Sequence, residues 1–164
     1  LTVSALQLVR ACGVLEQSGV MVTPHFLVDV PNDAEMAQSL MQDLTRRETV
    51  ADASVCDEVS EMLTSVVTEG TGQAAAVEGF AVTGKTGTAE NPRGRDHSTF
   101  LSFAPKDNPK IAISVYVENG GFGASAALPI ASLLEEYYLT DTIRRPALLE
   151  HIKNMNIYYP SYDR

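Results

Sequence analysis

The residues best suited to take part in a reaction are Lys85, Thr86, Gly87 and Thr88, which follow one another directly in the sequence. A lysine supplies positive charge, threonine supplies hydroxyl donors, and glycine lets a ligand approach the backbone closely. This composition suits a strand edge that binds a carboxylate and an oxyanion. The motif is too short to assign a function alone, so its surroundings decide how it is interpreted.

The same region also matches the phosphate-binding pattern G-x-x-x-x-G-K-[ST], from Gly79 to Thr86. A phosphate-binding loop needs an apolar strand before its first glycine and a helix that begins at the lysine. Here residues 71–78 do not have the composition of an apolar strand, whereas residues 80–83 favour a strand. The glycines and the proline that follow Thr86 disfavour a helix. We therefore expect a strand through Lys85 and no nucleotide-binding loop.

Composition excludes several classes of protein. The chain has 164 residues and a formal net charge of −9, and no basic stripe, so nucleic acid is not an expected partner. Cys12 and Cys56 lie far apart, which predicts buried apolar residues and neither a metal site nor a disulfide framework. The sequence starts at Leu1 inside an apolar pattern, without a signal-like segment, which suggests a piece of a larger protein.

Helical periodicity and turn residues predict the elements upstream of the motif. Apolar residues from Ala5 to Leu15 recur at helical spacing, with Thr2 or Ser4 as the cap. The other expected elements are a strand at 26–30, a helix at 33–46 and a helix at 56–68.

Downstream, short connections join three expected strands, at 80–88, 99–104 and 110–118, and this predicts an antiparallel meander. A helix at 125–138 is expected to cover the sheet, and a short helix is expected to begin near Pro146. The predicted fold class is therefore α+β, an α/β sandwich-like arrangement of a three-stranded antiparallel sheet with flanking helices. The residues expected on the apolar face of the covering helix are Ala127, Leu128, Ala131, Leu134 and Tyr138.

Three longer strings carry a resemblance to a known family. The strings Val82-Thr-Gly-Lys-Thr-Gly-Thr-Ala-Glu90, His97-Ser-Thr-Phe-Leu-Ser-Phe-Ala-Pro-Lys-Asp-Asn-Pro-Lys-Ile-Ala-Ile-Ser-Val-Tyr-Val-Glu-Asn-Gly-Gly121 and Ala127-Leu-Pro-Ile130 resemble the C-terminal part of the transpeptidase domain of class B penicillin-binding proteins. The second string is most similar to the elongation-type group, penicillin-binding protein two. The resemblance covers residues 1–139 and leaves 140–164 as a C-terminal tail with a short helix. It implies a partial penicillin-binding transpeptidase domain, which has a serine β-lactamase-like fold.

The resemblance also implies roles for the motif residues. Lys85 would supply positive charge and assist proton transfer around the nucleophile, and the backbone N–H of Thr88 would donate to the oxyanion hole. Thr86 would bind the carboxylate of the substrate or of a β-lactam, and Gly87 would leave room for the ligand. The implied reaction is serine acyl transfer between peptidoglycan stem peptides, with no metal and no organic cofactor. His97, His25 and His151 are expected to be structural or surface residues.

One part of the family pattern is missing. The family combines S-x-x-K, a Ser-x-Asn type element and K-T-G, yet no serine here has lysine three residues later and no Ser-x-Asn occurs. We expect the nucleophile upstream in a longer parent, so this fragment alone would be inactive. The alternative is a non-catalytic binding or scaffold homologue.

The resemblance implies the partners and location of the parent as well. Its partners would be peptidoglycan stem peptides, β-lactam antibiotics and the cell-elongation machinery. It would lie at the periplasmic face of the bacterial inner membrane, anchored by an N-terminal segment. The isolated fragment is expected to self-associate through an exposed apolar surface.

Overall fold

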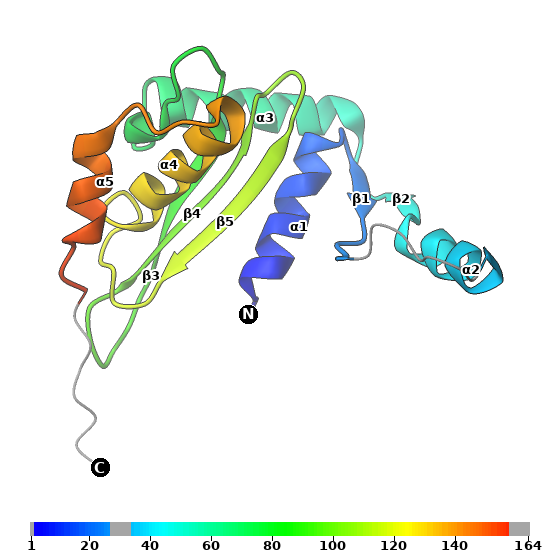
Figure 1. Cartoon of the computed structure of the whole chain (residues 1–164), viewed down its shortest axis with the longest axis horizontal. Helices are drawn as coiled ribbons and strands as arrows, with labels where there is room; N and C mark the ends of the chain where they lie inside the picture. The colour runs from blue at the N-terminus through cyan, green and yellow to red at the C-terminus, as the bar shows by residue number, and fades with distance from the viewer. Residues whose placement is uncertain (1, 27–33, 158–164) are drawn as a thin grey trace.

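The described part of the chain forms five α-helices and two small antiparallel sheets. The structure is a computed structural model, and it describes residues 2–26 and 34–157 (Figure 1). The elements in chain order are α1 (Ala5–Glu16), β1 (Val20–Val22), α2 (Ala34–Leu44), β2 (Arg47–Thr49), α3 (Ala53–Thr68), the 3-10 turn η1 (Gln73–Ala75), β3 (Thr83–Ala89), β4 (His97–Ala104), β5 (Ile111–Val117), α4 (Ala127–Thr140) and α5 (Pro146–Lys153). The expected α+β class is confirmed.

Helix α1 begins where the sequence places a cap. The Ser4 hydroxyl accepts from the backbone N–H of Gln7 at 3.3 Å, and the Gln7 side chain accepts from the N–H of Ser4 at 2.8 Å. This reciprocal capping box satisfies two N–H groups that a helix start leaves unpaired. The helix ends before Gly19, whose φ of +94° turns the chain into β1.

The sheet of β1 and β2 was not among the expected elements. Val20–Val22 pairs antiparallel with Arg47–Thr49, and α2 lies between the two strands in the sequence. Strands of three residues are too short to show alternation. The strand expected at 26–30 lies outside the described residues, except for Phe26, which is in a bend. The helix expected at 33–46 is described as Ala34–Leu44.

The expected three-stranded meander is confirmed. The strand order is β3-β4-β5, and both pairs are antiparallel, with Lys85 opposite Leu101 and Leu101 opposite Ser114. The predicted start of the first strand at residue 80 is wrong, because Gly79 has a φ of +85° and closes a turn in which the Phe80 N–H donates to the carbonyl of Val77 at 3.1 Å.

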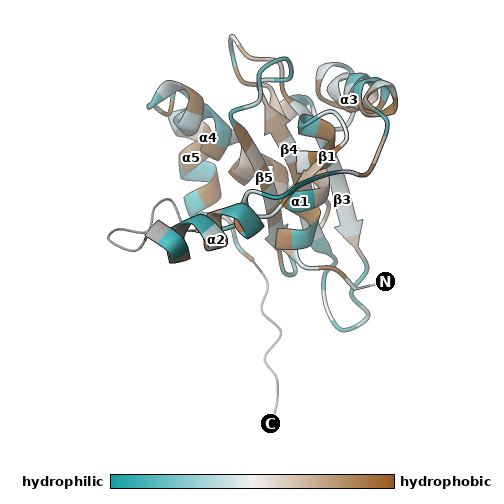
Figure 2. Cartoon of the chain, turned by 90° about the vertical axis from the view of Figure 1, so that its right-hand side faces the viewer, coloured by the Kyte–Doolittle hydropathy of each residue, from teal (hydrophilic) through white to brown (hydrophobic). Residues whose placement is uncertain are grey.

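Helices cover the sheet on both faces, α4 on one and α1 on the other (Figures 1 and 2). The main core lies between the sheet and α4, where the side chains of Phe100, Ala104 and Leu128 are almost fully buried. Helix α3 contributes Val67 to this core. Figure 2 shows apolar residues gathered at the sheet, whereas α2 is mostly hydrophilic.

The apolar face expected for α4 is partly wrong. Leu134 and Tyr138 are 50% and 57% exposed, while Ser132, Glu135 and Glu136 are buried against the rest of the fold. Two of these buried polar residues have partners that the helical pattern could not reveal. The Ser132 hydroxyl donates to the Ala74 carbonyl at 3.1 Å, and Glu136 forms an ion pair.

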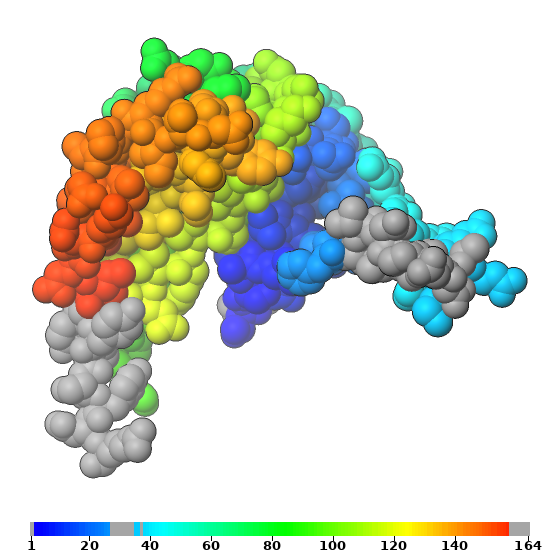
Figure 3. All heavy atoms as spheres, viewed as in Figure 1, coloured from blue at the N-terminus to red at the C-terminus, as the bar shows by residue number. Residues whose placement is uncertain are grey.

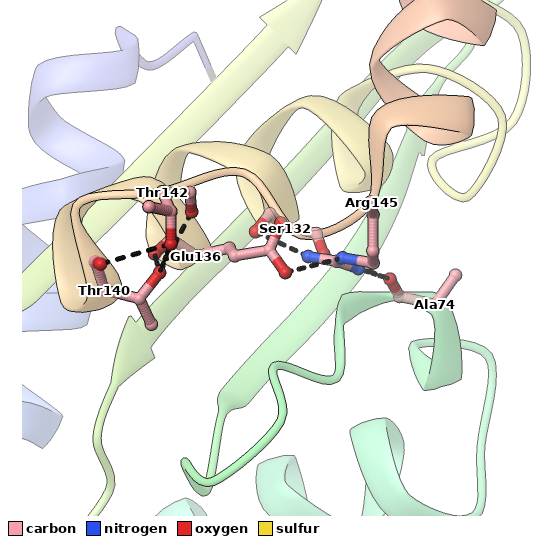
Figure 4. A network of polar contacts seen from close by, with 6 residues as sticks. All are labelled: Ala74, Ser132, Glu136, Thr140, Thr142 and Arg145. Atoms are coloured by element: carbon pink, nitrogen blue, oxygen red, sulfur yellow. Dashed lines mark hydrogen bonds and ion pairs between the residues drawn. The ribbon is translucent and has the colours of Figure 1, made fainter.

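That ion pair belongs to a cluster around Arg145 (Figure 4). The Arg145 guanidinium lies 3.2 Å from Glu136 Oε1 and donates to the carbonyls of Ser132 at 3.0 Å and Ala74 at 3.4 Å. One side chain thereby ties α4, η1 and the segment before α5 together. Helix α5 begins at Pro146, as the sequence predicts. Within the described residues, no helix is long and apolar enough to cross a membrane.

Candidate functional site

The motif occupies the exposed second half of β3, an edge strand of the sheet. The first half of the strand is fixed by α3, because the hydroxyls of Thr64 and buried Thr83 lie 2.9 Å apart. Lys85 is exposed, and its Nζ donates to the carbonyl of Thr86 at 2.9 Å. The lysine therefore sits in the middle of a strand, and the phosphate-binding interpretation of the same letters is wrong because it requires a helix start there.

Gly87 lies close against the side chain of its cross-strand partner. A Cβ added to it would lie 2.3 Å from the hydroxyl oxygen of Thr99, its cross-strand partner. Because Gly87 has no side chain, the backbone beside Lys85 is left uncovered. This is the geometry that close approach of a ligand to the backbone requires.

Thr86 is held by a residue that the sequence did not single out. Its hydroxyl lies 3.0 Å from the hydroxyl of Thr71, which comes from the loop after α3. The contact fixes the rotamer of a side chain expected to bind a carboxylate. No signal in the sequence pairs these two threonines, because 15 residues separate them.

Thr88 is held by the loop before α4. Its hydroxyl accepts from the N–H of Gly123 at 3.2 Å, and a Cβ on Gly123 would lie 2.5 Å from the carbonyl oxygen of Gly87. The buried hydroxyl of Ser98 anchors this loop, because it donates to the Phe122 carbonyl at 2.9 Å and accepts from the N–H at the start of α4 at 2.9 Å. The glycine-rich run had indicated only a turn.

Three of the four predicted site residues line one small cavity of about 180 Å³. Thr88 is not in its lining. The cavity lies between the sheet and α1, and helical periodicity predicted only that α1 has an apolar face. The lining residues are Leu8, Lys85, Thr86, Gly87, Thr99, Phe100, Leu101 and Ser114.

The groups with the largest pKa shifts lie elsewhere. Burial raises the pKa of the Cys12 thiol to about 12 and that of the Glu135 carboxyl to about 7. Cys12 and Cys56 are both buried free thiols, as predicted. His97 accepts from the N–H of Asn119 at Nδ1, at 3.0 Å, which joins the start of β4 to the segment after β5.

The β3 strand thus offers positive charge, hydroxyl groups and open backbone, but no activated nucleophile. Within residues 2–26 and 34–157, the hydrogen bond to Thr86 is the one polar contact of the Lys85 ammonium group. The same ranges hold no group of three metal-ligating side chains. Such a strand can bind an anionic group and stabilise developing negative charge.

Comparison with known proteins gives a consistent result. The family described as "Penicillin binding protein transpeptidase domain" matches residues 1–134. The chain is 28% identical over 161 residues to the peptidoglycan D,D-transpeptidase MrdA of Haemophilus influenzae, covering 87% of this chain and 24% of that protein. It is 35% identical over 141 residues to the probable peptidoglycan D,D-transpeptidase PenA of Neisseria flavescens, covering 79% and 32%.

Solved structures agree in fold. A peptidoglycan glycosyltransferase from Burkholderia ambifaria superposes with a TM-score of 0.68 at 28% identity, covering 96% of this chain and 43% of that one. The transpeptidase domain of Burkholderia pseudomallei penicillin-binding protein 3 gives 0.62 at 29% identity, covering 87% and 44%. The chain spans less than a third of the length of MrdA and of PenA. It belongs to the penicillin-binding protein transpeptidase family.

Proposed function

We propose that this chain supplies the Lys-Thr-Gly strand of a peptidoglycan D,D-transpeptidase that cross-links stem peptides by serine acyl transfer and is acylated by β-lactams. The observation that carries the proposal is the joint position of Lys85, Thr86 and Gly87 in one cavity at an exposed strand edge. Family membership and the relatives named D,D-transpeptidases support the same reaction.

Each motif residue has a role in this proposal. Lys85 is the positive charge beside the nucleophile, and the Thr86 hydroxyl, held by Thr71, binds the carboxylate of the stem peptide or of a β-lactam. Gly87 keeps the ligand's path open. The backbone N–H of Thr88 donates to the oxyanion of the tetrahedral intermediate, and the Gly123 contact holds that residue in place.

The nucleophile belongs to another part of a longer protein in this proposal. The chain itself contains no Ser-x-x-Lys and spans only part of its relatives. We propose residues 1–139 as the transpeptidase portion and 140–164 as a tail. A non-catalytic scaffold homologue is the competing function, and the missing Ser-x-x-Lys is the observation that favours it.

The partners and location follow from the same family assignment. The similarity to MrdA supports the elongation-type group, and hence an association with the cell-elongation machinery. The longer protein would act at the periplasmic face of the inner membrane, held there by an N-terminal anchor. We also propose that the isolated chain self-associates, because several large apolar side chains outside the site are about half exposed.

The test is the rate of penicillin labelling of the longer protein with Lys85→Ala. Losing one contact to developing negative charge slows such reactions by roughly 10²-fold to 10³-fold. Lys153→Ala is the matched control, because Lys153 is an exposed lysine that forms an ion pair with Glu150 on the same helix. Labelling of Lys85→Ala at the unmodified rate would remove this lysine from the site. A longer protein that is never labelled would favour the scaffold function.

A further inference from the structure

Ser98 lies behind the motif, on the central strand β4, where it is the cross-strand partner of Thr88. Partner residues of neighbouring strands point their side chains to the same face of the sheet. This is the α4 face, because the Ser98 hydroxyl accepts from the N–H of Ala127 at the start of α4. In Figure 3 the segment after β5 and α4, coloured yellow to orange, form a closed surface on this side. Ser98 is 0% exposed, so its hydroxyl bonds only within this chain.

The Ser98 hydroxyl uses both its donor and its acceptor capacity. Its single hydrogen is directed at two successive carbonyls, of Phe122 at 2.9 Å and of Gly123 at 3.1 Å. Its oxygen accepts from the N–H of Ala127 at 2.9 Å. One buried side chain thus fixes the segment before α4 at two points along its backbone.

Gly123 connects Ser98 to Thr88. Its carbonyl accepts from Ser98, and its N–H donates to the Thr88 hydroxyl at 3.2 Å. The backbone of this glycine lies directly against the strand pair, because an added Cβ would be 2.5 Å from the Gly87 carbonyl oxygen and 2.8 Å from that of Thr99. The position of Thr88 therefore depends on where Ser98 holds Gly123.

The direction of the Thr88 N–H follows from the alternation along β3. Successive residues of an antiparallel strand turn their backbone polar groups alternately toward and away from the neighbouring strand. The carbonyl of Thr86 accepts from the Lys85 ammonium group, so it points away from β4. The N–H of Thr88, two residues later, points the same way. The side chain of Thr88 is thus bound from behind, while its N–H faces the side of the strand where the Lys85 ammonium group lies.

We propose that Ser98 is a positioning residue for the oxyanion hole, a role that rests on the proposed transpeptidase function. Ser98 holds Gly123, and Gly123 holds Thr88, so that the Thr88 N–H keeps its direction toward the oxyanion of the tetrahedral intermediate. Ser98 itself touches no ligand. An oxyanion donor must be preorganised to stabilise charge that develops only in the transition state. The hydroxyl should therefore influence the acylation step and not the binding that precedes it.

Stopped-flow labelling of the longer protein with a fluorescent penicillin, over a concentration series, separates these two quantities. We expect Ser98→Ala to lower the acylation rate constant about tenfold, because a misplaced group costs up to roughly 10²-fold. The dissociation constant of the complex that forms before acylation should stay within about twofold, because a contact made only in the transition state does not change ground-state binding.

Ser132→Ala is the matched control for a lost buried hydroxyl. Ser132 is also 0% exposed, and its hydroxyl donates to the Ala74 carbonyl at 3.1 Å, in a contact that does not involve the segment holding Thr88. It should lower the thermal midpoint as Ser98→Ala does but leave the acylation rate constant unchanged.

Thr88→Val tests the connection through Gly123 at an exposed position, where loss of folding is not expected. It keeps the N–H of residue 88 but removes the hydroxyl that accepts from Gly123, so acylation should again slow about tenfold. Because both changes interrupt the same series of contacts, the double variant with Ser98→Ala should be slowed about tenfold and not a hundredfold.

The outcomes distinguish this role from the proposed function. Slowed acylation with unchanged binding, no slowing in Ser132→Ala and a non-additive double variant support it. Normal acylation in Ser98→Ala or in Thr88→Val, while Lys85→Ala is slowed, overturns the positioning role alone. Equal slowing in Ser132→Ala, weakened penicillin binding in Ser98→Ala, or a hundredfold effect in the double variant also overturns it. A longer protein that penicillin never labels overturns the proposed function and this role together.

Discussion

Gly87 leaves the backbone of β3 without a side chain beside Lys85, and a Cβ there would meet the hydroxyl of Thr99 at 2.3 Å. Lys85 beside it is exposed, whereas Thr86 and Thr88 are each held by one contact from a distant loop. At the residue scale, the site thus presents two hydroxyls held by neighbouring loops and an exposed ammonium group that donates to the Thr86 carbonyl. Such preorganisation is what stabilisation of an oxyanion requires.

Gly87→Ala should lower the free energy of unfolding by about 1–2 kcal/mol, because it overpacks the strand pair. Urea denaturation measures the change. The same substitution in a Thr99→Ala background should cost less, because the clashing hydroxyl is gone. Equal costs in both backgrounds would show that the contact with Thr99 is not the reason for glycine.

Glu135 predicts a pH dependence of stability. Burial raises the pKa of this carboxyl from 4.5 to about 7 in the folded chain. The folded state then binds more protons than the unfolded state between these values, so stability should fall as pH rises from about 4.5 to about 7. Glu135→Gln removes this titration and should lose about 1–3 kcal/mol less between pH 4.5 and pH 7 than the unmodified chain.

Urea denaturation at both pH values measures this difference. Glu69→Gln, at an exposed position, is the control and should follow the unmodified chain. An identical pH slope for Glu135→Gln would show that this buried carboxyl does not control the dependence.

At the scale of elements, the cluster around Arg145 joins segments that are distant in the sequence. Arg145→Ala would leave Glu136, whose side chain is 4% exposed, without its ion-pair partner. We expect a loss of about 2–4 kcal/mol of stability, since removing one partner of a buried pair leaves an uncompensated charge. Thermal denaturation measures it, and Arg144→Ala at the exposed neighbouring position is the control. A loss no larger than that of the control would rule out the cluster as a structural anchor.

The elements differ in how far the sequence determined them. The meander was predictable because β5 alternates strictly and Lys106-Asp107-Asn108-Pro109 is a strong turn. The pairing of β1 with β2 was not, because strands of three residues carry no period. The buried face of α4 was misassigned because Glu136 is compensated by Arg145, nine residues later, outside the helix.

The site, like the fold, was predictable only in part. Lys85, Thr86, Gly87 and Thr88 were placed on a strand from their neighbours, but their supports Thr71, Ser98 and Gly123 were not found. These supports come from contacts across 15 to 35 residues of sequence, which no local pattern encodes.

At the scale of the whole molecule, the chain carries a strand whose two threonine hydroxyls are held in place, and it lacks the family's Ser-x-x-Lys. A strand that supplies charge and donors cannot form an acyl-enzyme without a nucleophile held near its base. The central claim is therefore that the two halves of the chemistry lie on different parts of a longer protein.

Peptide mapping by mass spectrometry of the penicillin-labelled longer protein tests this claim directly. We predict one acylated serine, outside residues 1–164 and followed by lysine three positions later, with no adduct on this chain when it is incubated alone. An acylated residue within residues 1–164, or a stoichiometric adduct on the isolated chain, would contradict the account.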